Sequence, residues 1–187
     1  MRTFIAVTPP AEVAVHLDAL VHALARHGAD VRWSTGASIH VTLKFLGELD
    51  PAILPNLVSA LRQRVRRKAP FDLELHGLGG FPSLRSPRVV WCGLGAQPRL
   101  SELQAEVEKT CADFGYEPEQ RAFRPHLTLG RVRGTRNLRP LVEQLASAPP
   151  SVQGGFTVDH VDVYSSTLRR TGAVYDVLEA IVLEGTP

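Results

Sequence analysis

Two short segments of the chain combine a histidine with a threonine two residues later. They read HVTL at residues 40–43 and HLTL at residues 126–129. Alternate side chains of a β-strand point to the same face, so each segment, if extended, places its imidazole and its hydroxyl together. Imidazole titrates near neutral pH and can take or give a proton, while a hydroxyl can hold a phosphate oxygen. Two such pairs facing each other suit the cleavage of a phosphodiester.

A paired site requires His40, Thr42, His126 and Thr128 to converge, and simpler interpretations exist. A single histidine on a strand is usually structural, but here the match extends over four residues and occurs once in each half of the chain. A zinc site is disfavoured because threonine is a poor ligand and no cysteine or acidic residue accompanies either segment. We therefore expect an acid–base pair with no metal and no other cofactor.

The strands that would carry these residues alternate with helices along the whole chain. In the first half, periodicity and turn residues predict strands at Arg2–Thr8, Val31–Trp33 and Ile39–Leu46, and helices at Ala11–Arg26 and from Asp50-Pro51 onward. In the second half they predict strands at Phe71–Leu75, Arg88–Leu94, His126–Val132, Phe156–Ser165 and Ala173–Leu183. They predict helices at Pro98–Phe114 and Leu138–Ala146, the second ended by Pro149-Pro150. The expected loops are Gly77–Pro87 and Arg169–Gly172. Such alternation is typical of α+β or α/β proteins, and the matching halves are what an internal duplication would leave.

Composition and charge limit the classes of protein. The chain has 187 residues, with 21 Lys plus Arg against 19 Asp plus Glu and a formal charge of +2, which is ordinary globular usage. No apolar run approaches the roughly 18 residues that a membrane span requires, and the N-terminal apolar stretch is too short for a signal peptide. The two cysteines, Cys92 and Cys111, fit neither a disulfide framework nor a zinc pattern. We expect a cytoplasmic protein without a membrane partner.

Most of the cations are arginine, and they gather most densely at residues 62–68. Arginine suits phosphate oxygens, although a GC-rich coding sequence would produce the same bias. The run falls in the last turns of a predicted helix, where the helix dipole favours cations. We therefore interpret it as a solvated helix end in preference to an RNA contact.

The two segments and their surroundings resemble one family over essentially the whole chain. The sequences IHVTLKFLG at residues 39–47 and FRPHLTLGR at residues 123–131 are similar to the paired motifs of the two-histidine (2H) phosphoesterases. Within that superfamily they resemble the LigT-like RNA 2′,3′-cyclic phosphodiesterases, also called 2′-5′ RNA ligases. The opening strand, the segment at residues 79–91 and the C-terminal hairpin around Tyr164 and Tyr175 also resemble this family.

This resemblance implies one domain over residues 1–187, of α+β class, made of two duplicated lobes. Their antiparallel sheets would form a V-shaped cleft, with the helices outside. It also implies hydrolysis of RNA 2′,3′-cyclic phosphate ends to 2′-phosphate ends, with reversible 2′-5′ RNA ligation. We assign His40 as proton donor and His126 as proton acceptor, with Thr42 and Thr128 holding the phosphate. The expected partner is an RNA end or a small nucleotide, bound by a monomer.

Two other functions stay open on the sequence alone. The same chemistry could act on another nucleotide, such as a 2′-5′ oligoadenylate or an ADP-ribose cyclic phosphate. A non-catalytic nucleotide- or RNA-binding module could use the same pocket, although binding alone would not preserve an acid–base pair.

Phe45 and Arg131 are candidate substrate-binding residues whose position conflicts with simple alternation. Each lies five residues after a motif histidine, and so falls on the opposite face of a regular strand. The resemblance nonetheless places Phe45 near the nucleobase, which requires a bulge or a strand end. Gly130 makes a similar deviation plausible beside Arg131. Core packing is the alternative for Phe45.

Arg124, Tyr164 and Ser166 complete the candidate binding residues. Arg124 shares a face with the second histidine by parity, although Pro125 between them weakens that inference. The resemblance brings Tyr164 and Ser166 to the cleft, where a tyrosine could stack on a base. For Tyr164, packing on the core is the alternative, and for Arg124 it is a solvated position at the start of a strand.

Overall fold

The computed structural model describes residues 1–148, 152, 154–169 and 172–186. Its strands are β1 (Arg2–Val7), β2 (Val31–Trp33), β3 (Val41–Glu48), β4 (Phe71–Phe81), β5 (Val89–Leu94), β6 (His126–Val132), β7 (Gly155–Val158), β8 (His160–Arg169) and β9 (Gly172–Val182). Its helices are α1 (Ala11–Ala25), α2 (Leu54–Val65), α3 (Pro98–Ala112) and α4 (Leu138–Ser147), with 3₁₀ turns η1 (Gly36–Ser38) and η2 (Pro51–Ile53). The α+β class with antiparallel strands is confirmed. None of the helices in these described ranges is long and apolar enough to cross a membrane.

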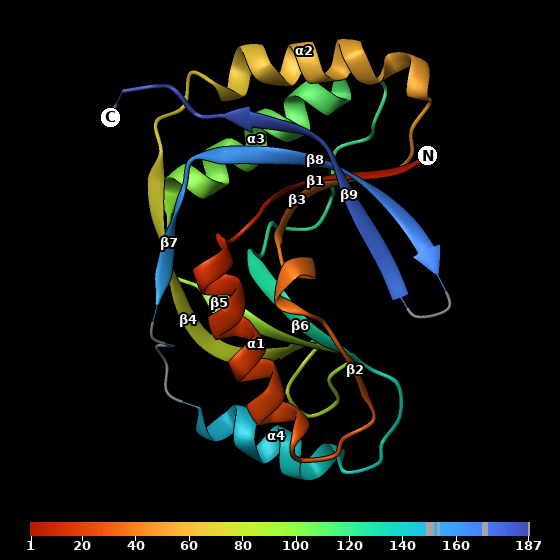
Figure 1. The fold of residues 1–187 in the computed structure, drawn as a ribbon, viewed down its shortest axis with the longest axis vertical. Helices are drawn as coiled ribbons and strands as arrows, with labels where there is room; N and C mark the ends of the chain where they lie inside the picture. The colour runs from red at the N-terminus through yellow and green to blue at the C-terminus, as the bar shows by residue number, and fades with distance from the viewer. Residues whose placement is uncertain (149–151, 153, 170–171, 187) are drawn as a thin grey trace.

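One curled sheet runs through the molecule in the order β7-β4-β5-β6-β3-β1-β8-β9, with β2 added beside β6. The junction of β6 with β3 divides this order into two sets of four strands, which we call the lobes. A single residue pair, Val41 with Leu127, joins them there. In Figure 1, α2 and α3 lie at the lobe of β1, β8 and β9, and α1 and α4 lie at the other. The lobes therefore meet between the strands that carry the two motifs.

The two strands that carry the motifs, β3 and β6, are each preceded along the chain by a helix that packs on the opposite lobe. Helix α1 precedes β3 but contacts β2 and β6, whereas α3 precedes β6 but contacts β3 and α2. The lobes are therefore not consecutive halves of the chain. The reciprocal packing is compatible with the duplication expected from the sequence, which stays a prediction.

The core lies on the side of the β3–β6 junction that faces away from the motif histidines. Val41, Leu43, Leu127 and Leu129 are all buried there, as the alternation of the two tetrapeptides predicts. They join one cluster with the inner faces of the helices. Burial of these four side chains fixes which face of each strand remains for the polar residues.

Two predicted elements differ from the structure. Strand β4 continues to Phe81 through the glycines expected to form a loop, because residues 78–81 pair with β5 beyond a bulge at Gly77. The strand expected at residues 156–165 is two strands interrupted at Asp159, since β7 pairs with β4 and β8 pairs with β1. The local sequence pattern does not show which strands will pair, so it predicts neither the longer β4 nor the interruption at Asp159.

Helix starts and stops follow the predicted signals with small shifts. Asp50 caps η2 by accepting a hydrogen bond from the backbone N–H of Ala52 at 2.9 Å, and α2 begins three residues later than Pro51. Helices α1 and α3 end slightly earlier than expected, at Ala25 and Ala112. The stop at Pro149-Pro150 and the central residues of the β8–β9 turn lie outside the described residues.

Candidate active site

The junction of the two lobes brings the four motif side chains together. Extending its register by one residue in each direction sets His40 opposite Thr128 and Thr42 opposite His126. Directly opposed residues of an antiparallel pair have Cβ atoms about 4.5–5.5 Å apart and share one face. All four side chains are half-buried, whereas the residues between them are buried. The convergence expected from the sequence is therefore present.

Each imidazole is held by a backbone carbonyl two residues earlier in the chain. His40 Nδ1 lies 2.9 Å from the Ser38 carbonyl oxygen, and His126 Nδ1 lies 2.7 Å from that of Arg124. A carbonyl oxygen can only accept, so Nδ1 carries the proton in both rings. Nε2 of each neutral ring is then left with its lone pair free to accept a proton.

Burial keeps both imidazoles neutral in the ligand-free protein. It lowers the pKa of His40 from 6.5 to about 4, against the bond to Ser38. The charge of Arg131, and that of His126 when it is protonated, lower this pKa further. Burial also lowers the pKa of His126, assisted by Arg131 and Arg124. The same guanidinium thus acts on both rings, which places Arg131 near the two of them.

An aromatic cluster on β1, β8 and β9 supports His40. The Phe4 ring stacks on the imidazole with 4.7 Å between centroids, and the Tyr164 ring stacks on Phe4 at 5.0 Å. Tyr175 stands edge-on to both Phe4 and His40, at 5.0 and 5.3 Å. Phe4 was missed by the sequence reasoning. Its signal is the alternation of β1, in which Phe4 and Ala6 share the face away from the main core.

Phe81 supports the ring of His126, as Phe4 supports that of His40. Its ring meets the imidazole edge-on at 4.9 Å, and the Arg124 guanidinium lies 4.8 Å from its centroid. Trp91 on β5 lies opposite the second motif threonine and packs against Phe81, with 5.2 Å between the ring centroids. Its indole covers Gly79, where a Cβ would come within 2.2 Å of the ring. Arg124 therefore lies beside the second histidine, as parity predicted, whereas Phe81 was not anticipated.

A β-bulge decides where Phe45 lies. On β1, Ala6 pairs with Thr42 and the preceding residue, Ile5, pairs with Lys44, so Leu43 is an extra residue in β3. One extra residue reverses the alternation, which turns Lys44 inward and Phe45 outward. Phe45 is 66% exposed, with its ring 6.0 Å from that of Phe4. It thus lies on the face of His40, and the core alternative for Phe45 is wrong.

A second bulge, in β6, reverses the alternation in the same way and turns Arg131 outward. In β6, Thr128 pairs with Trp91 and Gly130 pairs with Val90, so Leu129 is the extra residue. Arg131 is accordingly exposed, while its neighbour Val132 packs against the core. Both motif strands therefore carry the irregularity that the parity conflict demanded.

Tyr164 and Ser166 lie on β8, and neither side chain is exposed on the surface that carries the motif histidines. Tyr164 is 8% exposed, and its hydroxyl hydrogen-bonds with Thr8 Oγ1 at 2.6 Å. Thr8 Oγ1 donates to the buried carboxylate of Asp162 at 2.5 Å, so the Tyr164 hydroxyl gives its proton to Thr8 and lies 3.3 Å from that carboxylate. The ring of Tyr164 is therefore covered by Phe4 and is not offered to a base. Ser166 is half-buried and pairs with Tyr175 across β8 and β9.

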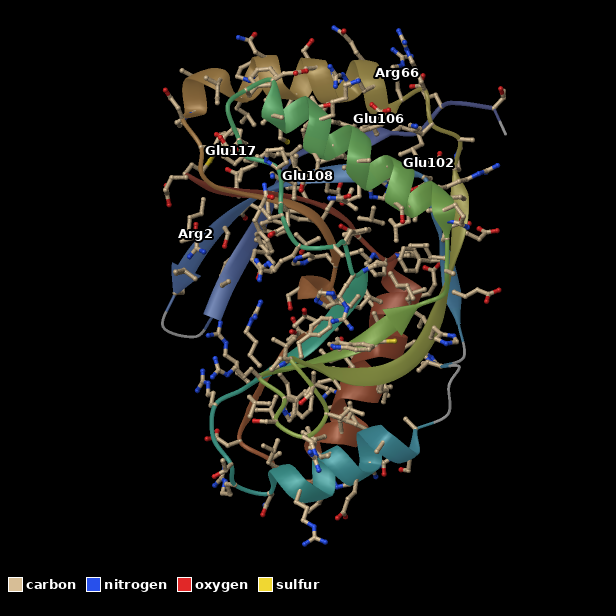
Figure 2. All side chains as sticks on the ribbon, turned by 180° about the vertical axis from the view of Figure 1, so that it is seen from behind. Arg2, Arg66, Glu102, Glu106, Glu108 and Glu117 are labelled. Atoms are coloured by element: carbon tan, nitrogen blue, oxygen red, sulfur yellow. The ribbon has the colours of Figure 1, made fainter. Side chains whose placement is uncertain are left out.

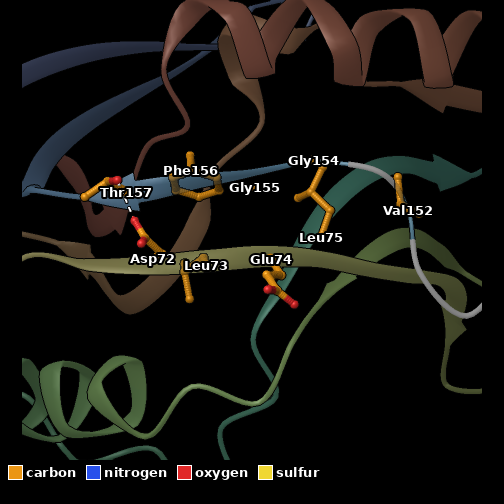
Figure 3. A pocket seen from close by; sticks show the side chains of 9 residues that line it. All are labelled: Asp72, Leu73, Glu74, Leu75, Val152, Gly154, Gly155, Phe156 and Thr157. Carbon is orange, nitrogen blue, oxygen red and sulfur yellow. Dashed lines mark hydrogen bonds between the residues drawn. The ribbon is translucent and has the colours of Figure 1, made fainter.

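A pocket of about 560 Å³ lies elsewhere, between β4 and β7 (Figure 3). The carboxylates of Asp72 and Glu74 line it, and Asp72 Oδ1 accepts from Thr157 Oγ1 at 2.6 Å. Such an acidic lining repels phosphate. None of the four motif side chains lines this pocket.

The basic run at residues 62–68 is largely paired with acidic residues. Figure 2 shows Arg66 near the end of α2 and Glu106 on the neighbouring helix α3. The pairs are Arg62 with Glu179, Arg64 with Asp113, Arg66 with Glu184 and Lys68 with Glu106. These carboxylates offset the charge, which agrees with a solvated helix end.

No cluster of three or more His, Cys, Asp or Glu that could hold a metal ion occurs in the described part of the chain. Cys92 and Cys111 are buried and free, and burial raises the pKa of their thiols to about 11 and about 12. Both are therefore protonated at neutral pH.

Comparisons with known proteins agree on one family. A sequence model of the 2′-5′ RNA ligase superfamily matches residues 9–170. An RNA 2′,3′-cyclic phosphodiesterase of Thermotoga maritima is 34% identical over 99% of this chain and 97% of its own length. Another, of Methanothermobacter thermautotrophicus, is 31% identical over 98% and 99%.

Solved structures show the same fold. A protein of Thermus thermophilus superposes with a TM-score of 0.84 at 27% identity, over 99% of both chains. Escherichia coli LigT in complex with 3′-AMP superposes with a TM-score of 0.78 at 27% identity, over 97% of both chains. The resemblance found in the two motifs is confirmed.

Proposed function

The chain belongs to the 2′-5′ RNA ligase superfamily, and from that membership we propose that it hydrolyses RNA 2′,3′-cyclic phosphate ends to 2′-phosphate ends. The observation that carries the proposal is the matched pair of imidazoles, each with its Nδ1 proton fixed by a carbonyl and its Nε2 free. The relatives from Thermotoga and Methanothermobacter are RNA 2′,3′-cyclic phosphodiesterases, and they align with this chain over almost their whole length. This similarity supports the same class of substrate.

The reaction needs one neutral and one protonated imidazole. The neutral Nε2 accepts a proton from water as its oxygen attacks phosphorus, and the bond from phosphorus to O3′ breaks. The protonated ring gives its Nε2 proton to O3′, which leaves a 3′-hydroxyl and a 2′-phosphate. The hydroxyls of Thr42 and Thr128 and the guanidinium of Arg131 hold the non-bridging oxygens as charge develops on them. No step of this scheme uses a metal.

Which histidine gives the proton stays a proposal. The sequence-based assignment makes His40 the donor and His126 the acceptor. Burial lowers the pKa of both rings in the ligand-free protein, that of His40 to about 4, so either can supply the neutral base. An anionic cyclic phosphate between the rings favours the protonated form of both.

Ligation uses the same steps with a different nucleophile, and the reverse of ligation cleaves a 2′-5′ linkage to a cyclic phosphate and a 5′-hydroxyl. A 5′-hydroxyl would then replace water, and joining it to the cyclic phosphate forms a 2′-5′ linkage. In water, hydrolysis dominates because the competing nucleophile is the solvent.

Nucleotide binding without turnover is the second candidate. Escherichia coli LigT has been crystallised with ATP and with NADP⁺, at 29% identity to this chain. A groove that accepts such nucleotides could serve binding alone. The free Nε2 atoms favour the enzyme.

A single assay separates these functions. The protein is incubated with 2′,3′-cyclic AMP in excess chelator, and the products are identified by ³¹P NMR. We expect accumulation of 2′-AMP at a rate unchanged by the chelator. Binding without product would support the binding module, loss of activity with chelator would indicate a metalloenzyme, and 3′-AMP would contradict the proposed bond cleavage.

A further inference from the structure

Arg32 and Arg131 lie directly opposite each other where β2 pairs with β6. Opposed residues share a face of the sheet. Their neighbours Val31, Trp33 and Val132 pack against the main core, so the two guanidiniums project from the other side. That side carries the imidazoles and threonines of the motifs.

This arrangement is unfavourable for the protein alone. Like charges directly opposite in a sheet destabilise it. Within the described ranges neither Arg32 nor Arg131 forms an ion pair, whereas three arginines of the α2 end do. Both side chains are exposed. Two uncompensated guanidiniums side by side form a site for an anion, and their planar donor groups match phosphate oxygens.

The spacing separates this site from the reacting phosphate. Arg131 follows Thr128 by three residues, which is roughly 10 Å along a strand. The long side chain of Arg131 can reach back toward the imidazoles. Arg32 lies on β2, on the edge of β6 that also pairs with β3, three positions along β6 beyond the residue opposite His40. Arg32 is thus placed for a neighbouring phosphate of the same ligand.

We propose that Arg32, beside Arg131, binds a second phosphate of the substrate, the 5′-phosphate of the nucleotide that carries the cyclic phosphate, while Arg131 faces the reacting phosphate. This inference rests on the proposed function. In an RNA end that 5′-phosphate is the diester to the preceding nucleotide, and in a mononucleotide it is a terminal monoester. The site therefore distinguishes substrates by a group remote from the bond that breaks.

The test compares three substrates: 2′,3′-cyclic AMP, its 5′-phosphorylated form, and the dinucleotide ApA ending in a 2′,3′-cyclic phosphate. We expect kcat/KM to be roughly 10- to 100-fold higher when the second phosphate is present, the range for a hydrogen bond between charged groups. An advantage for either form supports the proposal, and the form that gains identifies the source of the phosphate.

The decisive variant is Arg32→Ala. It should bring the ratio of kcat/KM values close to one, while Arg32→Lys keeps part of the advantage because it retains the charge but not the fork. Arg139→Ala is the matched control, since Arg139 is an exposed arginine of α4 paired with Glu143. It should keep the full ratio. Each ratio is measured on one preparation, so a loss of folded protein cancels.

Two results would overturn the inference: an advantage that survives in Arg32→Ala, or a wild-type protein that shows none. Failure of the proposed function has a different signature, because none of the three substrates would then be hydrolysed.

Discussion

Each motif histidine obtains its chemistry from its own strand. The carbonyls of Ser38 and Arg124 fix the tautomer of the ring two residues later, which leaves Nε2 for the substrate. A tripeptide therefore carries both the reacting group and the hydroxyl beside it, while the backbone just before it supplies the orienting carbonyl. For this reason the two motifs could be identified as a candidate site from the sequence alone.

The lowered pKa values of His40 and His126 predict an acidic optimum for kcat/KM. The reactive state holds one proton on the pair, and both pKa values lie below 6.5 in the free protein, so this state is lost as pH rises above that value. We expect kcat/KM to fall about tenfold per pH unit on this limb. The optimum of kcat should be higher, because the bound anion raises the pKa of both rings.

Steady-state profiles on 2′,3′-cyclic AMP measure both optima. A kcat/KM that stays level or rises from about pH 6.5 to about pH 8 would be inconsistent with neutral imidazoles in the free protein.

Phe4 is predicted to act as a positioning residue for His40. Phe4→Leu keeps an apolar side chain in a site that is 3% exposed but removes the flat face under the imidazole. Stacking is worth about 0.5–1.5 kcal/mol, so we expect kcat to fall by up to about tenfold. KM should change little, while the lost contacts with Tyr164 and Tyr175 should lower the melting temperature by about 2–4 °C per kcal/mol. A variant with unchanged kcat and an unchanged pH profile would show that the ring only fills space.

At the scale of elements, the two bulges do what alternation could not predict. Strict parity puts Phe45 and Arg131 on the core side, and an extra residue at Leu43 and at Leu129 reverses them. Gly130 gave a local signal for the second bulge. Nothing in the residues around Leu43 gave one, because that bulge depends on how β3 pairs with β1.

The bulge in β3 also creates a buried ion pair that links this strand to α3. Lys44, 6% exposed, donates to Glu108 Oε2 and to the Glu117 carbonyl oxygen, each at 2.6 Å. Glu108→Ala leaves the ammonium without its carboxylate, and removing one partner of a buried pair costs about 3–5 kcal/mol. We expect that loss in the free energy of unfolding, measured by urea denaturation.

Glu143→Ala is the control for this prediction. Its partner Arg139 is 89% exposed, so the change should stay within about 0.5 kcal/mol. Equal losses in the two variants would show that burial of the Lys44–Glu108 pair does not matter.

At the scale of the whole molecule, the strands and helices near the motifs were predictable, and their partners were not. Local periodicity located β6 and placed α4 to within a residue, and it identified the buried side of both motif strands. Phe4, Phe81 and Tyr175 come from β1, β4 and β9, and reach the histidines only through the sheet order. Such contacts depend on tertiary pairing, which one sequence does not specify through its local pattern.

The proposed chemistry depends on two distant strands placing their imidazoles on one phosphodiester. The most direct test compares kcat for 2′,3′-cyclic AMP in His40→Ala, His126→Ala and the double variant, with folding checked by circular dichroism. Each single change should lower kcat by about 10²- to 10⁴-fold, and the double variant should be no slower than the worse single, because groups that act as a unit are not additive. Full activity in either single variant, or losses that multiply in the double variant, would contradict the account.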